Sequence, residues 1–238
     1  TAAPLLSNLA RQGADVQLVI VTDGRWGGAS TDEEADALAA TRALESQCST
    51  DALGINSPML LAYEDGEVSE NVQELNVVMH TLITNLQPDV VITWGPEGGY
   101  GHKDHRLVST LVAGAFQKGP AVDGDPWPDA VYYPGVLTEQ LYGFTPTSYF
   151  GYVMQAIWGT TEEEYLQYTI EVDATDTAAA KTAAACHTSQ WDAATLVDID
   201  ALLDAGNNEL RLRKSHHKGR DRSSLFHQHH GFFSGKEY

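Results

Sequence analysis

The sequence has few cysteines and few cationic residues, and it contains no long apolar run. Its two cysteines, Cys48 and Cys186, are too few for a disulfide-stapled scaffold, and their spacing leaves open whether they pair or remain free thiols. No apolar run approaches the roughly 20 residues that a membrane-spanning helix needs. The chain also opens without a secretory signal peptide, at Thr1-Ala2-Ala3-Pro4. We therefore expect no membrane span.

The balance of charge is strongly acidic. Lysine and arginine total 14 against 33 acidic residues, which gives a formal net charge of −19. Because an acidic surface repels phosphate backbones, binding to nucleic acid is not expected. The same charge favours a soluble protein, whereas compartment and oligomeric state stay open. With 42% hydrophobic residues among 238, the chain is long enough for a single domain with a full core, residues 1–238.

Apolar runs and helical periodicity alternate along the first half of the chain. Buried strands are expected at residues 16–21, 58–63 and 90–93, and helices at 4–12, 31–47, 72–86 and 106–116. Further on, candidate strands lie at 131–133, 149–153 and 168–172, and a helix at 178–185. This alternation predicts an α/β fold with a doubly wound, mostly parallel sheet. Because the first helix precedes the first strand, a strand expected before that helix is absent from the sequence.

The chain is organised around a glycine-rich turn that runs from Trp94 to Arg106 and contains His102-x-Asp104-His105. It follows the predicted strand at 90–93 and leads into a helix. In open parallel sheets, ligands bind at the carboxyl ends of the strands. Imidazole is the commonest side-chain metal ligand and a general acid or base near neutral pH, and a neighbouring carboxylate can fix its tautomer. The turn is thus a candidate catalytic or metal site. The alternative interpretation is a surface loop with two solvated histidines and no function.

The segment from Gln87 to His105 resembles the second signature, G-H-P-D-H, of the LmbE-like or PIG-L-like zinc-dependent N-acetyl-sugar deacetylases, with Lys103 in place of the proline. Four further segments are similar to that family in the same order: Val19 to Gly24, Arg42-x-x-Glu45, Asp65-Gly66, and Lys181 with His187-Thr188-Ser189-Gln190. Each match alone is weak, but their order and spacing together make the resemblance specific.

The resemblance implies a Rossmann-like fold and a site with one zinc ion. In that family the residue matching His105 is a metal ligand, and the one matching His102 stabilises or protonates the reacting centre. Asp104 would orient His102, and Tyr100 would help to hold the oxyanion. Two further residues, Arg42 and Asp65, are candidates for contacts with substrate. A helix-surface ion pair and an ordinary Asp-Gly turn explain those two equally well.

The sequence departs from the family at one point. The first signature, H-P-D-D-E, supplies two zinc ligands and the general base in that family, and it does not occur in these residues. Thr1 resembles a threonine just downstream of that signature. We therefore interpret the chain as one LmbE-like domain that is incomplete at its amino terminus and lacks its first strand. The other two metal ligands are expected upstream of Thr1. The alternative is a degenerate relative that has lost the motif.

For the complete protein, the resemblance implies a zinc-dependent hydrolase that removes an acetyl group from a small-molecule N-acetylated amino sugar, such as an N-acetylglucosamine conjugate. One alternative is a non-catalytic sugar-binding module of the same fold. Another is a metallohydrolase of that fold acting on a different amide or ester. A histidine-rich tail, residues 216–230, is interpreted as a terminal segment without a dedicated site.

Overall fold

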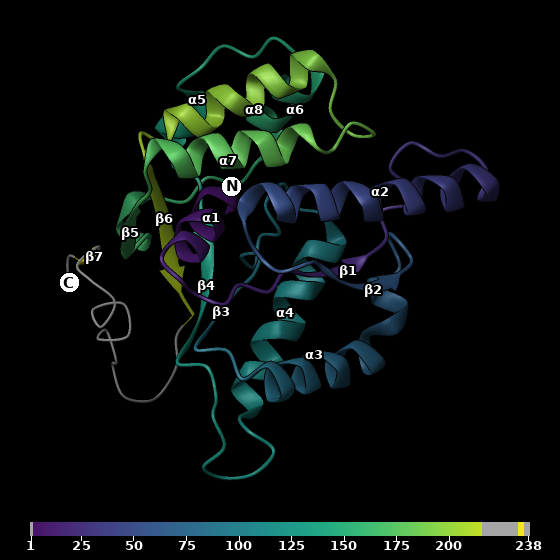
Figure 1. The fold of residues 1–238 in the computed structure, drawn as a ribbon, viewed down its shortest axis with the longest axis vertical. Coiled ribbons are helices and arrows are strands. Elements are labelled where there is room, and N and C mark those ends of the chain that lie inside the picture. The colour runs from purple at the N-terminus through teal and green to yellow at the C-terminus, as the bar shows by residue number, and fades with distance from the viewer. Residues whose placement is uncertain (1, 216–232, 236–238) are drawn as a thin grey trace.

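The computed structural model describes residues 2–215 and 233–235 (Figure 1). The histidine-rich segment 216–230 lies outside these residues. The described α-helices are α1 (Ala3–Arg11), α2 (Asp32–Leu53), α3 (Val72–Leu86), α4 (Lys103–Lys118), α5 (Thr138–Tyr142), α6 (Tyr149–Ile157), α7 (Ala174–Ala185) and α8 (Ala193–Ala205). The strands are β1 (Val19–Thr22), β2 (Met59–Tyr63), β3 (Val90–Ile92), β4 (Ala130–Gly135), β5 (Tyr168–Glu171), β6 (Glu209–Lys214) and β7 (Phe233–Gly235). Short 3-10 turns occupy Val68–Asn71 and Glu163–Tyr165.

The strands form two groups, β1-β2 and β3-β4-β6-β5-β7. Pairing is parallel between β1 and β2 and between β3 and β4, whereas β6 runs antiparallel to both β4 and β5. The predicted α/β fold is confirmed, with its parallel pairs confined to the first four strands, β1 to β4. The antiparallel part arises where the chain, after passing through α7 and α8, enters the sheet between β4 and β5 as β6.

Helices cover both faces of the strands. One layer holds α1, α2 and α7, and the other holds α3 packed on α4 (Figure 1). The core beneath α3 and α4 is formed by Val21, Leu75, Met79, Ile83, Leu111, Val112, Ala115, Phe116, Val131 and Tyr133. On the opposite face, Leu5 of α1 packs with Tyr132, Ile170, Val172, Leu210 and Leu212. At roughly 1.5–3 kcal/mol for each large apolar side chain, these two cores supply most of the favourable free energy of folding.

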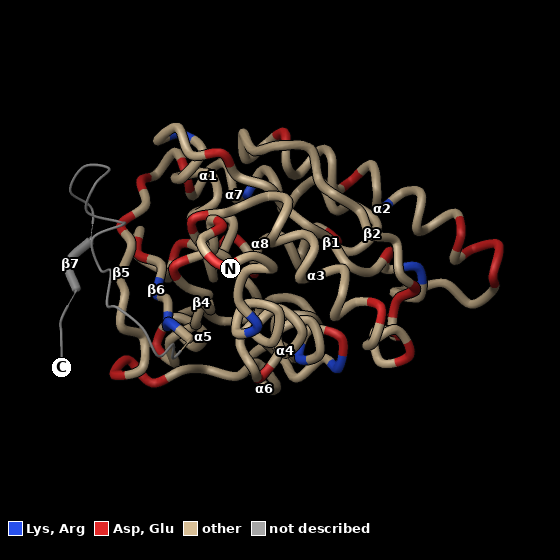
Figure 2. The backbone as a smooth tube through the Cα atoms, turned by 90° about the horizontal axis from the view of Figure 1, so that it is seen from below, with Lys and Arg blue, Asp and Glu red and all other residues tan. Residues whose placement is uncertain are grey.

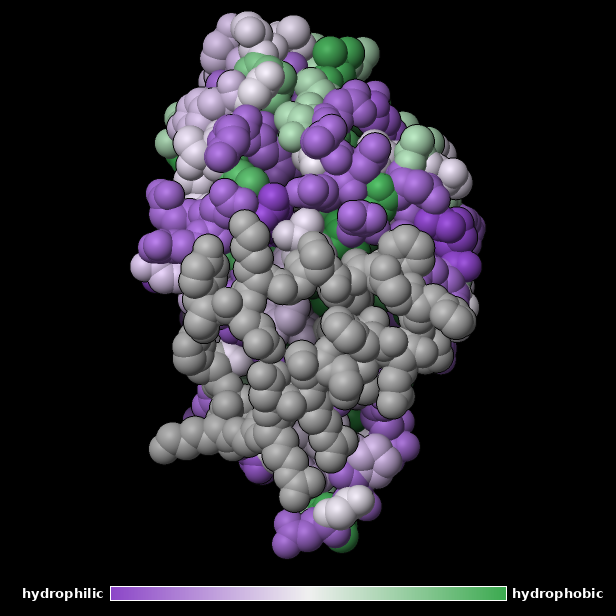
Figure 3. All heavy atoms as spheres, turned by 90° about the vertical axis from the view of Figure 1, so that its left-hand side faces the viewer, coloured by the Kyte–Doolittle hydropathy of each residue, from purple (hydrophilic) through white to green (hydrophobic). Residues whose placement is uncertain are grey.

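The surface matches the acidic composition. Figure 2 shows Asp and Glu spread along the backbone from β5 to α2, with few Lys and Arg among them. On the face seen in Figure 3, hydrophilic residues predominate among the described atoms above the grey ones.

The prediction of a strand at residues 149–153 was wrong, because these residues form α6. Ser148 is the N-cap of this helix, and its hydroxyl accepts a hydrogen bond from the Gly151 amide at 2.9 Å. The buried Asp198 carboxylate in turn accepts bonds from the Ser148 amide and hydroxyl at 2.9 and 2.6 Å. Aromatic residues favour strands on average, but here the cap and the carboxylate from α8 decide the local structure.

The two cysteines form a disulfide. Cys48 on α2 is joined to Cys186 at the end of α7, across a sequence separation of 138 residues and a Cα–Cα distance of 5.8 Å. The sequence alone left this pairing open. The bridge fixes α2 against α7, two helices of the same layer.

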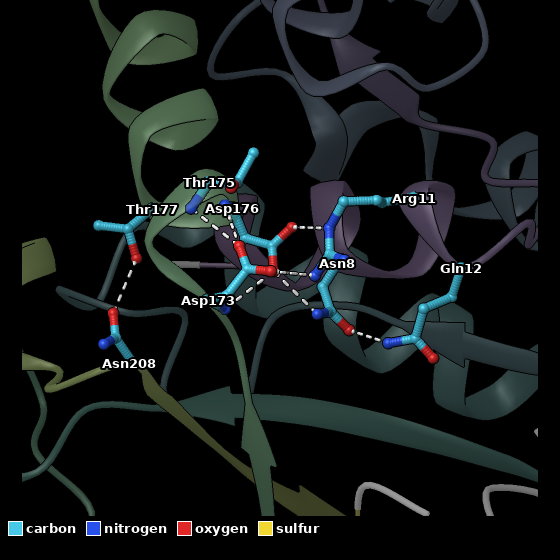
Figure 4. Close-up of polar contacts among 8 residues, drawn as sticks. All are labelled: Asn8, Arg11, Gln12, Asp173, Thr175, Asp176, Thr177 and Asn208. Atoms are coloured by element: carbon cyan, nitrogen blue, oxygen red, sulfur yellow. Dashed lines mark hydrogen bonds and ion pairs between the residues drawn. The ribbon is translucent and has the colours of Figure 1, made fainter. Parts of the chain in front are cut away.

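A buried carboxylate ties α1 to α7 (Figure 4). Asp176 lies in the first turn of α7 and is fully buried. It accepts a hydrogen bond from Asn8 at 2.8 Å and two from the Arg11 guanidinium at 3.1 and 3.0 Å, and it closes a capping box with Asp173. Burial by itself would raise the pKa of Asp176, but the bonds from Arg11 and Asn8 hold that pKa below its ordinary value.

We expect Asp176→Ala to lower the free energy of unfolding by about 2–3 kcal/mol, because it leaves the buried Asn8 amide without an acceptor. Urea denaturation at neutral pH measures this. Folding lowers the pKa of Asp176. Its contribution to stability is therefore complete above the unfolded-state pKa of 3.8, and it is lost as the pH falls through the pKa of Asp176 in the folded protein. The stability of the variant should therefore lack this dependence on pH. A urea midpoint equal to that of wild type would show that the hydrogen bonds to Asp176 contribute nothing to stability.

Candidate functional site

The candidate site lies where β3 ends and α4 begins. Between them, the turn from Trp94 to Gly101 reverses the chain, and Gly98 and Gly99 adopt φ values of +70° and +69°. A Cβ on Gly98 would lie 2.6 Å from the Arg106 side chain and 3.0 Å from the His102 carbonyl oxygen. Glycine is therefore required for the turn to fold back onto the start of α4, and this places both histidines at one strand end.

His102 is the N-cap residue of α4. Its Nδ1 accepts a hydrogen bond from the backbone amide of Asp104 at 3.3 Å. Because an amide N–H can only donate, Nδ1 must be the acceptor, and the ring proton of the neutral imidazole then resides on Nε2. His102 thus presents an N–H donor to the site.

His105 has the opposite tautomer. Its Nδ1 lies 3.2 Å from the Gly98 carbonyl oxygen, which can only accept, so Nδ1 carries the proton and Nε2 keeps its lone pair. The ring stacks on Trp94, with centroids 3.9 Å apart and planes 5° from parallel. Burial holds the pKa of His105 below its ordinary value, so the ring is neutral at neutral pH. A neutral imidazole whose other N–H is fixed by a carbonyl is the usual form of a metal ligand.

Asp104 is buried, at 3% exposure, and its carboxylate contacts the turn that follows β2. Its Oδ2 accepts a hydrogen bond from the Gly66 amide, in the turn after β2, at 2.7 Å. The sequence led us to expect that its carboxylate orients His102; instead the backbone amide of Asp104 makes that contact, because the residue lies in the first turn of α4. Its Oδ1 has no hydrogen-bond partner. A buried carboxylate oxygen without a donor is costly unless a cation or proton meets it.

Asp65 and Tyr100 complete the group. Asp65, His102 and Asp104 each offer a ligand atom, and these atoms lie within 4.8 Å of one another. The Tyr100 ring lies 5.7 Å from the His102 ring and 5.5 Å from the His105 ring, between centroids. Burial and the nearby Asp65 and Asp104 carboxylates raise the pKa of Tyr100. The hydroxyl therefore stays protonated at neutral pH and can donate a hydrogen bond.

Arg42 lies apart from this group. Its guanidinium donates to the carbonyl oxygens of Gly24 and Gly27 and so holds the loop after β1. A side chain on either glycine would collide with the guanidinium. The structure therefore brings together Tyr100, His102, Asp104, His105 and Asp65, and it places Arg42 beneath the neighbouring loop.

Two features of the site region escaped the sequence interpretation. Glu45, only 5% exposed, accepts hydrogen bonds from the Thr188 hydroxyl at 3.1 Å and from the Ser189 amide and hydroxyl at 2.6 and 2.7 Å. Both segments carried the family resemblance, but nothing in either indicated that they meet. The stacking of Trp94 on His105 was also missed, although a tryptophan directly before the glycine-rich turn was a signal.

The residues present fit a divalent metal ion. The group supplies imidazole nitrogens and carboxylate oxygens, which is a donor set that zinc accepts. The unpartnered Oδ1 of Asp104 and the free Nε2 of His105 are two atoms whose lone pairs a cation could accept.

In the described part of the chain, no helix combines the length and the apolar character that crossing a membrane requires.

Comparison with known proteins shows which family the first part of the chain is similar to. Residues 1–116 match the family model described as PIG-L, GlcNAc-PI de-N-acetylase. The chain is 28% identical to the 1D-myo-inositol 2-acetamido-2-deoxy-alpha-D-glucopyranoside deacetylase of Rhodococcus erythropolis over 161 aligned residues. This alignment covers 56% of the present chain and 55% of the relative. The chain thus spans about half the length of the curated relatives that it matches. The resemblance predicted from the sequence is confirmed.

The likeness to solved structures extends beyond residue 116. N,N'-diacetylchitobiose deacetylase from Pyrococcus horikoshii superposes with a TM-score of 0.65 at 19% identity, covering 90% of this chain and 77% of that one. The 4-carboxy-2-hydroxymuconate hydratase GalB from Pseudomonas putida gives 0.61 at 15% identity and covers 92% of both chains. At these identities the likeness shows a shared fold, and the two enzymes differ in the reaction that each is named for.

Proposed function

We propose that the protein is a metal-dependent hydrolase, with zinc as its cofactor, that removes the acetyl group from an N-acetylated amino sugar or its conjugate. One observation carries this proposal. His105 has its Nε2 free and lies next to a buried carboxylate, Asp104, that has an oxygen without a partner. The deacetylases among the curated relatives support the choice of reaction.

His105 would hold the metal through Nε2. The His102 ring lies 4.9 Å from the His105 ring between centroids, and His102 shares with Asp65 and Asp104 a second group of candidate ligand atoms, which lie within 4.8 Å of one another. When bound, a zinc ion lowers the pKa of a coordinated water and polarises a carbonyl. The carbonyl of Gly98 keeps His105 in the required tautomer, and Trp94 keeps its ring plane fixed.

Two hydrogen-bond donors face the reacting centre in this proposal. His102 supplies Nε2–H, and Tyr100 supplies its hydroxyl. Donors placed where negative charge develops stabilise the tetrahedral state of acyl transfer. Trp158, whose ring lies 5.9 Å from that of Tyr100, and Trp94 give this side of the site an aromatic wall against which a sugar face can pack. Arg42 would act on substrate indirectly, by holding the loop at Gly24 and Gly27.

The test is acetate release by the complete protein isolated from its source, with N,N'-diacetylchitobiose and an N-acetylglucosaminyl inositol as substrates. We expect His102→Gln to lower kcat by roughly 100- to 1,000-fold, the cost of removing one oxyanion donor, while bound zinc is retained. His80→Gln is the matched control, since His80 lies on α3 and contacts the Gly119 carbonyl oxygen. Unchanged turnover in the His102 variant would refute its role.

The alternatives give different results in the same experiment. A sugar-binding module of this fold would bind the chitobiose and release no acetate from any substrate. A metallohydrolase of another amide or ester would bind zinc, leave both sugars intact and cleave a different member of a substrate panel. Acetate must be measured directly, because the same fold occurs in a hydratase.

A further inference from the structure

The ion pair between Arg213 and Glu97 joins the carboxy-terminal half of the chain to the glycine-rich turn. Glu97 lies in the turn between β3 and α4, and Arg213 lies on β6, 116 residues further along the chain. Both side chains are largely covered, at 24% exposure for Arg213 and 32% for Glu97. An ion pair on an open surface contributes little, but attraction is stronger where water is partly excluded. The pair is therefore placed to fix the shape of the turn.

The guanidinium of Arg213 is itself held in place. Arg213 is opposite Tyr133 in the register of β6 and β4, and its Cζ lies 5.8 Å from the centre of the Tyr133 ring. A cation at this distance from an aromatic face is attracted to it. The ion pair closes over Gly95, where a Cβ would collide with both the guanidinium and the Glu97 carboxylate. Arg213 thus reaches the turn from a paired strand of the sheet.

Glu97 directly precedes two glycines, Gly98 and Gly99, that are buried and have positive φ. The Gly98 carbonyl oxygen lies 3.2 Å from His105 Nδ1. The Gly99 carbonyl oxygen accepts a hydrogen bond from the Gly159 amide at 3.0 Å. Glycine adopts many backbone conformations, so the peptide unit between Gly98 and Gly99 could rotate if nothing held it. A rotated peptide unit would point its N–H at His105 in place of the Gly98 carbonyl.

Such a rotation would change the tautomer of His105. A backbone N–H that faces Nδ1 requires Nδ1 to accept, and the ring proton of the neutral imidazole would then reside on Nε2. A protonated Nε2 has no lone pair with which to bind a metal ion. The orientation of one peptide unit therefore decides whether His105 can be a ligand through Nε2.

We propose that Arg213 is a positioning residue. Through Glu97 it holds the turn in the conformation that points the Gly98 carbonyl at His105, and so it keeps Nε2 of that ring free. Arg213 lies outside residues 1–116, which match the family model, so the carboxy-terminal half of the chain sets the state of a residue in the first half. The consequence for metal binding rests on the proposed function, whereas the control of the tautomer does not.

NMR of the ring nitrogens tests the proposal, on the complete protein after a chelator has removed any metal. The signals of His105 are those that His105→Gln lacks. In wild type we expect the proton on Nδ1, and in Arg213→Met and Glu97→Gln we expect the opposite tautomer to appear beside it. The double variant Glu97→Arg/Arg213→Glu restores the ion pair and should restore the wild-type tautomer. Glu97→Gln should also weaken zinc binding by roughly 10- to 100-fold, the usual cost of losing an outer-shell partner.

Arg211→Met is the matched control. Arg211 lies on the same strand and pairs with Glu163 at 3.0 Å and with Glu209 at 2.8 Å, neither of which belongs to the turn. If Arg213→Met and Glu97→Gln lower the urea midpoint and leave His105 in its wild-type tautomer, the ion pair is only structural and the proposal is wrong. An equal change of tautomer in Arg211→Met would also overturn it. Because the tautomer is read without acetate release, this proposal and the proposed function can fail separately.

Discussion

Replacing His105 by alanine is expected to abolish stoichiometric zinc binding and to lower kcat/KM for deacetylation by more than about 100-fold. Loss of an outer-shell partner alone costs 10- to 100-fold in metal affinity or activity, and a direct ligand contributes more. The free Nε2 of His105, set by the Gly98 carbonyl, is the physical basis for this result. Metal analysis after dialysis and steady-state kinetics on the complete protein measure the two effects.

Asp65→Asn is the matched control for the metal. Asp65 offers a ligand atom within 4.8 Å of those of His102 and Asp104, so a metal held by that group would be weakened by this change. If His105 is the ligand, the Asp65 variant keeps its zinc and the His105 variant loses it. The reverse pattern would move the metal to the group formed by Asp65, His102 and Asp104.

Removing the disulfide with the double variant Cys48→Ala/Cys186→Ala is expected to lower the free energy of unfolding by about 4 kcal/mol. The bridge closes a loop of 138 residues, and in the chain-entropy account such long loops lie near the upper end of the usual range. The measurement is urea denaturation of wild type and variant, each with and without dithiothreitol.

Dithiothreitol should lower the urea midpoint of wild type and leave that of the variant unchanged. This comparison separates the loss of the disulfide from any other effect of the reductant on stability. A wild-type midpoint that is insensitive to complete reduction would contradict the prediction. Bridges of this kind persist in oxidising compartments, so the same experiment also shows how far the fold depends on its surroundings.

How much could be predicted from the sequence depended on whether the contact was local. The unit of β3, glycine-rich turn and α4 was predicted because an apolar run, four glycines and a helical repeat follow one another within about thirty residues. Both histidines and Tyr100 therefore fell at one strand end, as the structure shows. The tautomers could not be read, because each depends on which backbone atom faces the ring.

Contacts between distant segments were not predictable from residue types. The bond from Gly66 to Asp104 spans 38 residues, and that from Ser189 to Glu45 spans 144. Nothing in the periodicity of either segment indicates its partner. The prediction of a strand at 149–153 failed for the same reason, since the carboxylate that organises the start of α6 comes from Asp198 on α8.

The excess of acidic residues, seen along the backbone in Figure 2, would also affect how charged molecules approach and leave the site of the proposed reaction. Acetate leaves as an anion, and a net charge of −19 repels it once it is released, which opposes inhibition by accumulating product. The same field slows the approach of sugar phosphates and other anionic conjugates at low salt, and the effect fades as ionic strength shortens the Debye length. Under the proposed function, neutral acetylated sugars would therefore reach the protein faster than anionic ones.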